Sequence, residues 1–322
     1  MRVRLPRIDN FDLNLFEFDY DLTFMVFFMD ANERIYARYG GRDAENADNR
    51  QSLEGLRQTM LSVLQTHKTE KTRIAPRTTG GPKFIREGNQ MGGGRCMHCH
   101  DIKEELNRQL VAQGDWDRDQ VWRYPLPENV GFRLFVDKPN MVERVTKGSP
   151  AEKAGLEPGD QIRQMGSIPI HSFADAQTAL DRAPVSGKLS IVYRRSGKDQ
   201  KSTLELTEGW RKTDLTWRTS MRRMIPRFSL PGKDLTSDEK KALGLPSNVL
   251  AYRLADTVSQ RLKDLGFEPK DLVLGIEGKP LHLSASEFVG FVEREYLVGD
   301  SVRILVNRNG RSVVVPMALA NR

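Results

Sequence analysis

Both cysteines of this chain lie in one short motif, Cys96-Met97-His98-Cys99-His100. Two thiols at Cys-x-x-Cys spacing can reach the two vinyl groups of a haem, and the histidine that follows can ligate its iron. Because the chain has no other cysteine, a disulfide framework is excluded. The pattern therefore predicts a haem c attached through Cys96 and Cys99, with His100 as the iron ligand.

Three other interpretations of this motif remain open. An exposed Cys-x-x-Cys at the start of a helix has a lowered thiol pKa, which would make Cys96 and Cys99 a redox dithiol. A zinc site would combine the two thiols with His98 or His100, but the sequence identifies no fourth ligand. The third is a structural or vestigial role. The setting counts against haem, because the surrounding segment is polar and glycine-rich whereas a haem must be wrapped in apolar surface.

The segment that carries the motif, residues 71–128, is rich in Arg, Gly, Pro and Lys. This composition indicates a linker. After the motif, Leu106 and Leu110 have the spacing of one short helix.

Residues 1–70 show the pattern of a β-hairpin followed by a helix, and the sequence begins inside a predicted strand at residues 3–5. Residues 22–29 and 34–39 predict two strands around a turn, and residues 52–66 carry apolar side chains at helical spacing behind a serine cap. In order and length this resembles the second half of a thioredoxin-like fold. The family's first strand, and the first helix that begins with its redox cysteines, have no counterpart here. The resemblance implies a partial thioredoxin-like unit, either truncated at its start or kept as a structural remnant.

An internal repeat occupies the rest of the chain. Four residues recur at one constant offset: Gly155 and Gly266, Asp160 and Asp271, Pro169 and Pro280, His171 and His282. The stretch 148–162, with its Ser-Pro-Ala and Gly-Asp steps, closely resembles the PDZ domains of the bacterial high-temperature-requirement proteases. The resemblance implies a first PDZ domain at 129–208, a connector at 209–244, and a second, PDZ-like domain at 245–320.

The resemblance also implies the fold class and the mode of binding. We expect a mixed α/β and mainly β protein, with a partial thioredoxin-like unit followed by two PDZ-like, partly open β-barrels with capping helices. In a PDZ domain an extended peptide adds as a strand to an open sheet edge beside a helix. A glycine-containing loop donates backbone N–H groups to the terminal carboxylate of the peptide.

The expected peptide-binding residues of the first domain belong to that loop, its strand and the facing helix. They are Val130, Gly131, Phe132, Arg133, Leu134, Phe173, Ala176, Gln177 and Leu180. Phe173 and Leu180 are equally consistent with barrel core. The carboxylate loop of the second domain is placed at residues 243–246, where Pro246 removes one N–H donor. A binding role and a purely structural role therefore both stay open for the second domain.

Charge and composition narrow the class of partner. The 322 residues carry a net charge of +7, but both signs are mixed along the chain. Short clusters such as Arg194-Arg195 are interpreted as solvated faces, and His171 and His282 as surface turn residues. No nucleic-acid-binding motif occurs, and no apolar run has the ~18 residues of a membrane span.

Two functions follow from these observations. The favoured one is an extracytoplasmic scaffold, in the periplasm or cell envelope, that binds peptide or protein C-termini and extended segments. No signal peptide precedes it in this sequence, so a cytoplasmic location is the alternative. The second function is enzymatic: a thiol–disulfide oxidoreductase using Cys96 and Cys99, or a regulatory fragment of a PDZ protease. The protease version lacks a Gly-x-Ser-x-Gly element.

Overall fold

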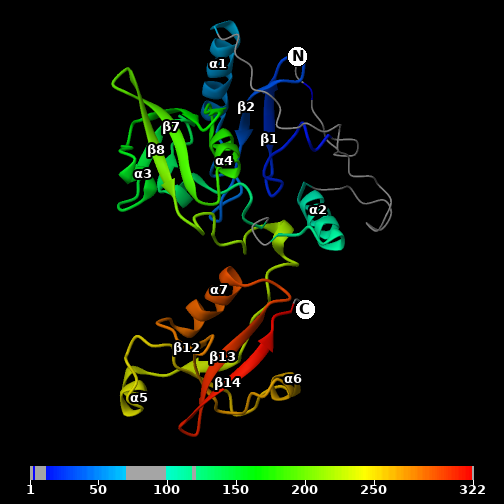
Figure 1. Ribbon diagram of the computed structural model, residues 1–322, viewed down its shortest axis with the longest axis vertical. Helices are drawn as coiled ribbons and strands as arrows, with labels where there is room; N and C mark the ends of the chain where they lie inside the picture. Colours follow the sequence, from blue (N-terminus) through cyan, green and yellow to red (C-terminus); the bar gives the residue numbers. More distant parts are fainter. Residues whose placement is uncertain (1–2, 4–11, 70–98, 118–120, 321–322) are drawn as a thin grey trace. The chain divides into compact units, whose positions relative to one another are not determined.

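A computed structural model describes residue 3 and residues 12–69, 99–117 and 121–320 (Figure 1). The chain divides into two compact units, residues 1–220 and residues 221–322, which are described separately. All the strand pairs of the described part are antiparallel, in keeping with the mixed, strand-rich fold class expected from the sequence.

The first unit opens with the expected hairpin and helix. Strand β1 (Met25–Met29) pairs with β2 (Ile35–Gly40), and helix α1 (Leu53–Thr69) follows. The Tyr39 hydroxyl ties them together, because it accepts a hydrogen bond from the Ser52 N–H and donates one to the Ser52 carbonyl. The predicted hairpin with a packed helix is confirmed. Of the strand expected at residues 3–5, residues 4 and 5 lie outside the described part.

Helix α2 (Cys99–Gln113) confirms the short helix expected after the cysteine motif. Its Ile102 is buried in an apolar cluster of the first unit. The other buried members of this cluster come from the aromatic stretch before β1: Leu13, Phe18, Tyr20 and Leu22.

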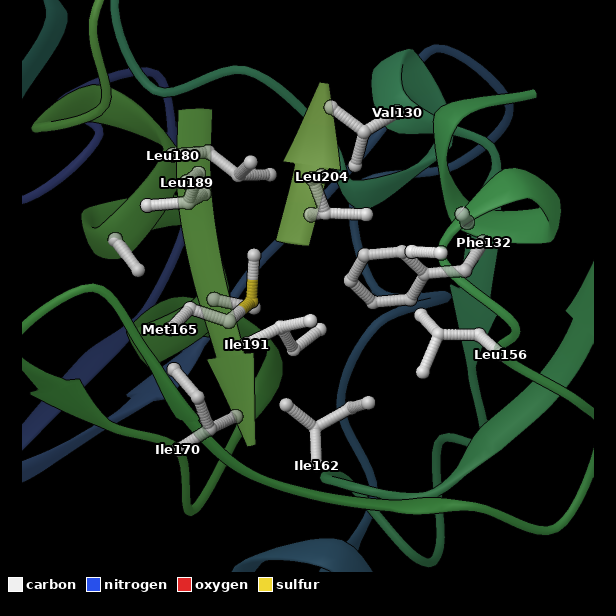
Figure 2. Close-up of a cluster of buried hydrophobic side chains, with 14 of the residues drawn as sticks. Val130, Phe132, Leu156, Ile162, Met165, Ile170, Leu180, Leu189, Ile191 and Leu204 are labelled. Atoms are coloured by element: carbon white, nitrogen blue, oxygen red, sulfur yellow. The ribbon is translucent and has the colours of Figure 1, made fainter. Parts of the chain in front are cut away.

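The first repeat forms the larger part of this unit, and its elements follow in chain order. They are η2 (Pro127–Val130), β3 (Phe132–Leu134), β4 (Val142–Val145), α3 (Pro150–Lys153), β5 (Gln161–Met165), β6 (Ile168–Pro169), α4 (Phe173–Asp181), β7 (Gly187–Arg195) and β8 (Lys198–Leu206). The sheet order is β6-β5-β7-β8, and a bridge between Met141 and Gln161 links it to the β3–β4 pair. Figure 2 shows the apolar core that these strands enclose, with Phe132, Ile162 and Ile191 among its members.

The second unit repeats this order of elements. After η3 (Thr219–Met221) come β9 (Gly232–Asp234), α5 (Ser237–Ala242), β10 (Tyr252–Leu254), α6 (Gln260–Asp264), β11 (Leu272–Ile276), β12 (Lys279–Pro280), α7 (Ala285–Glu295), β13 (Ser301–Arg308) and β14 (Arg311–Ala318). The strands lie in the order β14-β13-β11-β10-β9, with β12 beside β11. From β9 to β14, each element except α5 has a counterpart in the first repeat: β9 corresponds to β3, α7 to α4 and β14 to β8.

Two sequence expectations for the second repeat are wrong. Its first strand, β9, lies inside the segment expected to be a connector. The strand was not predicted because Gly-Lys-Asp has none of the apolar or β-branched residues that mark a strand. Residues 243–246 follow α5 instead of preceding an edge strand, so they are not the counterpart of the glycine loop at Gly131. Helix α5, with a capping box between Thr236 and Glu239, lengthens the β9–β10 connection and hides the repeat.

Candidate functional site

The residues expected to bind a peptide in the first unit are almost all buried. Arg133 is half-buried, and its guanidinium pairs with Glu143 at 3.1 Å on the neighbouring strand β4. The others are inaccessible in the folded first unit: Val130, Gly131, Phe132, Leu134, Phe173, Ala176, Gln177 and Leu180. Val130, Phe132 and Leu180 point into the core of this repeat (Figure 2). The core interpretation that the sequence left open for Leu180 is therefore the one the structure shows.

Gly131 has a structural reason to be glycine. Its φ of +93° is in the left-handed region, and its N–H donates to the Glu128 carbonyl at 3.0 Å. A Cβ at this position would stand 2.0 Å from the Cβ of Ser149, the residue that caps α3. Close packing against Ser149 accounts for this glycine without any ligand.

Helix α4, which the sequence places opposite the peptide, is buried at all nine of its residues. One side of α4 contacts β2, which also packs against α1 (Figure 1). The Arg38 N–H donates to Asp175 at 2.9 Å, and the Ser172 hydroxyl donates to the Arg38 carbonyl. Burial raises the pKa of Asp175 to about 7, and the nearby Arg38 opposes this shift.

Other parts of the chain cover the remaining side of α4. The Gln177 side chain donates to the Tyr124 carbonyl at 3.1 Å, and Arg123 pairs with Asp181 at 2.6 Å. The Arg50 guanidinium lies over the Phe173 ring at 5.1 Å from its centroid. The surface expected to select a peptide is thus occupied by segments of the same unit.

His171 is a further correction. It is 9% exposed, and its Nδ1 is hydrogen-bonded to the Ser62 hydroxyl on α1 at 2.7 Å. Burial lowers the pKa of His171 to about 4. The sequence could not show that α1 packs over this turn. His282, at the corresponding turn of the second unit, is exposed as expected.

In the second unit, the strand that corresponds to β3 is accessible. All three residues of β9 are exposed. Strand β9 is the last strand of its sheet, and among the described residues no strand pairs with its other edge. Such an edge presents backbone N–H and C=O groups that a further strand can use.

The hydrogen bonds on either side of β9 show which backbone groups face this open edge. The Leu235 N–H donates to Ala251 and the Ala255 N–H donates to Pro231, in register with the pairing of Lys233 and Arg253. Because the bonds of an antiparallel pair alternate along the strand, Lys233 directs its backbone groups to β10. Gly232 and Asp234, on either side of it, therefore direct theirs to the open edge.

Helix α7 runs beside this edge. The Phe228 ring, just before β9, packs edge-to-face on Phe288 of α7 with centroids 5.3 Å apart. At the end of β9 the Asp234 carboxylate accepts from the N–H of Ala285, the first residue of α7, at 3.1 Å. Ala285 and Val289, one helical turn apart, are half-buried against the core of this unit. The β9 edge and this apolar helix face form the candidate site.

The cysteine motif falls only partly within the described residues. Cys96 and His98 lie outside them, whereas Cys99 begins α2 and packs against the apolar cluster around Ile102. Burial raises the pKa of the Cys99 thiol, opposite to the lowered pKa expected of a redox dithiol. His100 lies 3.5 Å from the Asp101 carboxylate. Because Cys96 lies outside the described residues, haem attachment through Cys96 and Cys99 stays a prediction.

Strand β9 was not predicted, although the sequence carries a signal for it. A Thr-Ser-Asp-Glu capping box at Thr236 predicts a helix start, and Leu-Pro-Gly-Lys-Asp precedes it. Aligning the repeats backward from Asp160 and Asp271, with this helix treated as an insertion, places β9 opposite β3.

Comparison with known proteins identifies the domain formed by the first repeat. Residues 141–195 match the PDZ domain family, so the chain contains a PDZ domain in its first unit. A probable periplasmic serine endoprotease DegP-like of Hahella chejuensis (strain KCTC 2396) is 24% identical over 271 residues, covering 77% of this chain and 56% of that protein. The periplasmic serine endoprotease DegP of Escherichia coli (strain K12) is 29% identical over 126 residues, covering 38% of this chain and 26% of that protein.

The chain spans about half the length of the curated DegP-like relatives that match most of it. Among solved structures, the HtrA-type protease AlgW with decapeptide is 19% identical and covers 41% of this chain and 40% of its own. The TM-score between the two structures is 0.27. No helix of the described part is both long and apolar enough to cross a membrane.

Proposed function

We propose that this chain is a peptide-binding scaffold and that its second unit accepts the peptide at the open edge of β9. The observation that carries this proposal is the position of β9. It is an exposed terminal strand whose Gly232 and Asp234 direct backbone groups outward, beside the half-buried apolar face of α7. A PDZ domain in the same chain, and the similarity to DegP-like proteins, support the same class of function.

An extended peptide would bind as an antiparallel strand. Its backbone would form hydrogen bonds with Gly232 and Asp234, which supply affinity without regard to sequence. Gly232 and Asp234 pair with Leu254 and Tyr252, whose side chains are buried in the core. Because paired residues share a sheet face, the peptide side chains opposite Gly232 and Asp234 would point toward α7, where Ala285 and Val289 favour apolar groups.

The first unit has a different part in this proposal. For a peptide to enter beside α4, the contacts of Arg38, Arg50 and Tyr124 with that helix would have to break. We therefore assign the first PDZ domain the task of holding the N-terminal hairpin and α1. The DegP-like relatives are named as periplasmic proteins, and we propose an extracytoplasmic location for this chain too.

Peptide binding to the full chain tests the proposal. A fluorescent peptide library with free or amidated C-termini is titrated against wild type, Val289→Lys and Ser286→Lys. Val289 is half-buried on the α7 face that packs against the core, one turn after Ala285, whereas Ser286 is exposed. We expect Val289→Lys to weaken binding at least tenfold and Ser286→Lys to leave it unchanged. Equal binding by all three proteins would show that the peptide does not bind beside α7.

A further inference from the structure

We infer that the β9 edge selects peptides carrying an acidic residue at the position opposite Lys233. This inference rests on the proposed function and names the class of ligand. It starts from a like-charge contact in the sheet. Lys233 on β9 and Arg253 on β10 are cross-strand partners, and both side chains are exposed. Like charges placed directly opposite each other on one sheet face destabilise the pair.

The acidic groups near this pair compensate Arg253 rather than Lys233. The hydrogen bond from the Thr236 backbone is the largest cause of the lowered pKa of Glu239 on α5. The charge of Arg253 contributes to the same shift. Within the described ranges, no carboxylate forms an ion pair with Lys233. The next residue, Asp234, directs its carboxylate to the N-terminus of α7 instead. An ammonium group without a partner therefore stands at the rim of the open edge.

The register of the sheet makes this ammonium a near neighbour of any added strand. Lys233 uses its backbone groups on β10, so a peptide residue opposite Lys233 would form a non-hydrogen-bonded pair with it. Residues in such pairs have Cα atoms only ~4.5 Å apart, and their side chains lie closer than in hydrogen-bonded pairs. A carboxylate at this position would meet Lys233 directly and would lie on the same face as Arg253.

The peptide residue opposite Lys233 lies on the outer face of the sheet. It is therefore distinct from the peptide residues that face α7 and are selected for apolar side chains. Lys233 and Arg253 lie on the face opposite to Tyr252 and Leu254, which belong to the core. An added strand would thus alternate between residues that face α7 and one that faces Lys233. The ligand class is an extended peptide with an Asp or Glu flanked on both sides by apolar residues.

A charge-swap experiment with the full chain tests this inference. The tightest peptide of the library is resynthesised with Asp, Asn or Lys at each position in turn, and each version is titrated against wild type, Lys233→Gln and Lys233→Glu. At one position we expect wild type to favour Asp over Lys by about three- to fivefold, the range of an exposed charge pair. Lys233→Gln should abolish the preference, Lys233→Glu should reverse it, and added salt should reduce it in wild type.

We expect these variants to fold, because Lys233 is exposed and Lys233→Glu replaces a like-charge pair with Arg253 by an opposite-charge pair. A wild type without charge preference, or a preference that Lys233→Glu leaves unchanged, would overturn the inference. Those results would leave the proposed function standing as long as Val289→Lys still weakens binding. If wild type bound no peptide of the library, both the proposed function and the inference about Lys233 would be contradicted.

Discussion

The guanidinium of Arg308 donates two hydrogen bonds, of 2.9 and 2.8 Å, to the buried carboxylate of Asp271 and a third to the Gly266 carbonyl. Arg195 binds Asp160 and the Gly155 carbonyl in the same way. Each arginine is the last residue of a long strand, β13 or β7, and each aspartate ends the turn that leads directly into β11 or β5. The two units therefore share a tertiary clamp, which connects the repeated Gly and Asp residues to an arginine.

The clamp predicts a large effect of Arg308→Ala on the second unit. Asp271 is 1% exposed, and removing its partner leaves a buried carboxylate without its main counter-charge. We expect a loss of about 2 kcal/mol in the free energy of unfolding, below the range for fully buried pairs because Arg308 is partly exposed. Chemical denaturation of the full chain measures it.

The matched control is Arg303→Ala on the same strand. Arg303 pairs with Glu277, and its side chain is 64% exposed, so its loss should change stability by no more than about 0.5 kcal/mol. Equal effects of Arg303→Ala and Arg308→Ala would show that the clamp contributes no more than a surface ion pair.

Replacement of Gly131 is predicted to destabilise the first unit irrespective of any ligand. In Gly131→Ala the new Cβ meets the Cβ of Ser149 at 2.0 Å, and the backbone keeps a φ of +93°. Gly148 has a φ of +78° with open space around it, so Gly148→Ala carries only the backbone strain. We expect Gly131→Ala to cost about 1–3 kcal/mol more than Gly148→Ala, the usual range for overpacking. Thermal unfolding of both variants decides it, and equal losses would contradict the packing account.

The buried ring of His171 predicts a dependence of stability on pH. Its pKa is about 4 in the folded chain and about 6.5 when unfolded, so the unfolded chain binds the proton more readily. The stability that His171 contributes as a neutral ring is complete above pH 6.5 and is lost as the pH falls toward 4. Relative to His171→Gln, wild type should lose about 2 kcal/mol between pH 7.5 and 4.5.

Urea unfolding of wild type and His171→Gln at both pH values measures this difference. The matched control is His282→Gln, at the exposed counterpart of the same turn. If the difference between wild type and His171→Gln does not change with pH, the ring is not the buried neutral group described above.

The sequence predicted the elements whose signals are local. The hairpin over β1 and β2, the capped helix α1 and the Ser149-Pro150 start of α3 follow from alternation, capping residues and turn chemistry. The constant offset between Asp160 and Asp271 also predicted the repeat correctly. These features need no knowledge of what the chain packs against.

The errors concern contacts between distant segments. Arg195, interpreted as part of a solvated cluster, holds Asp160, which lies 35 positions earlier in the chain. Phe173 and Gln177 were expected to meet a ligand, but Arg50 and Tyr124 cover them. Strand β9 was missed because a three-residue strand without apolar residues is defined by its pairing with β10 rather than by its composition.

The most direct test of the central claim is amide hydrogen exchange of the full chain, read residue by residue by NMR, with and without the tightest peptide of the library. We predict that the peptide slows exchange at the N–H groups of Gly232 and Asp234, which face the open edge. The N–H of Lys233, bonded within the sheet, should change little, and so should those of Phe132 and Leu134 in the first unit. Protection that appears at Phe132 and Leu134 while Gly232 and Asp234 stay unchanged would contradict peptide binding at β9.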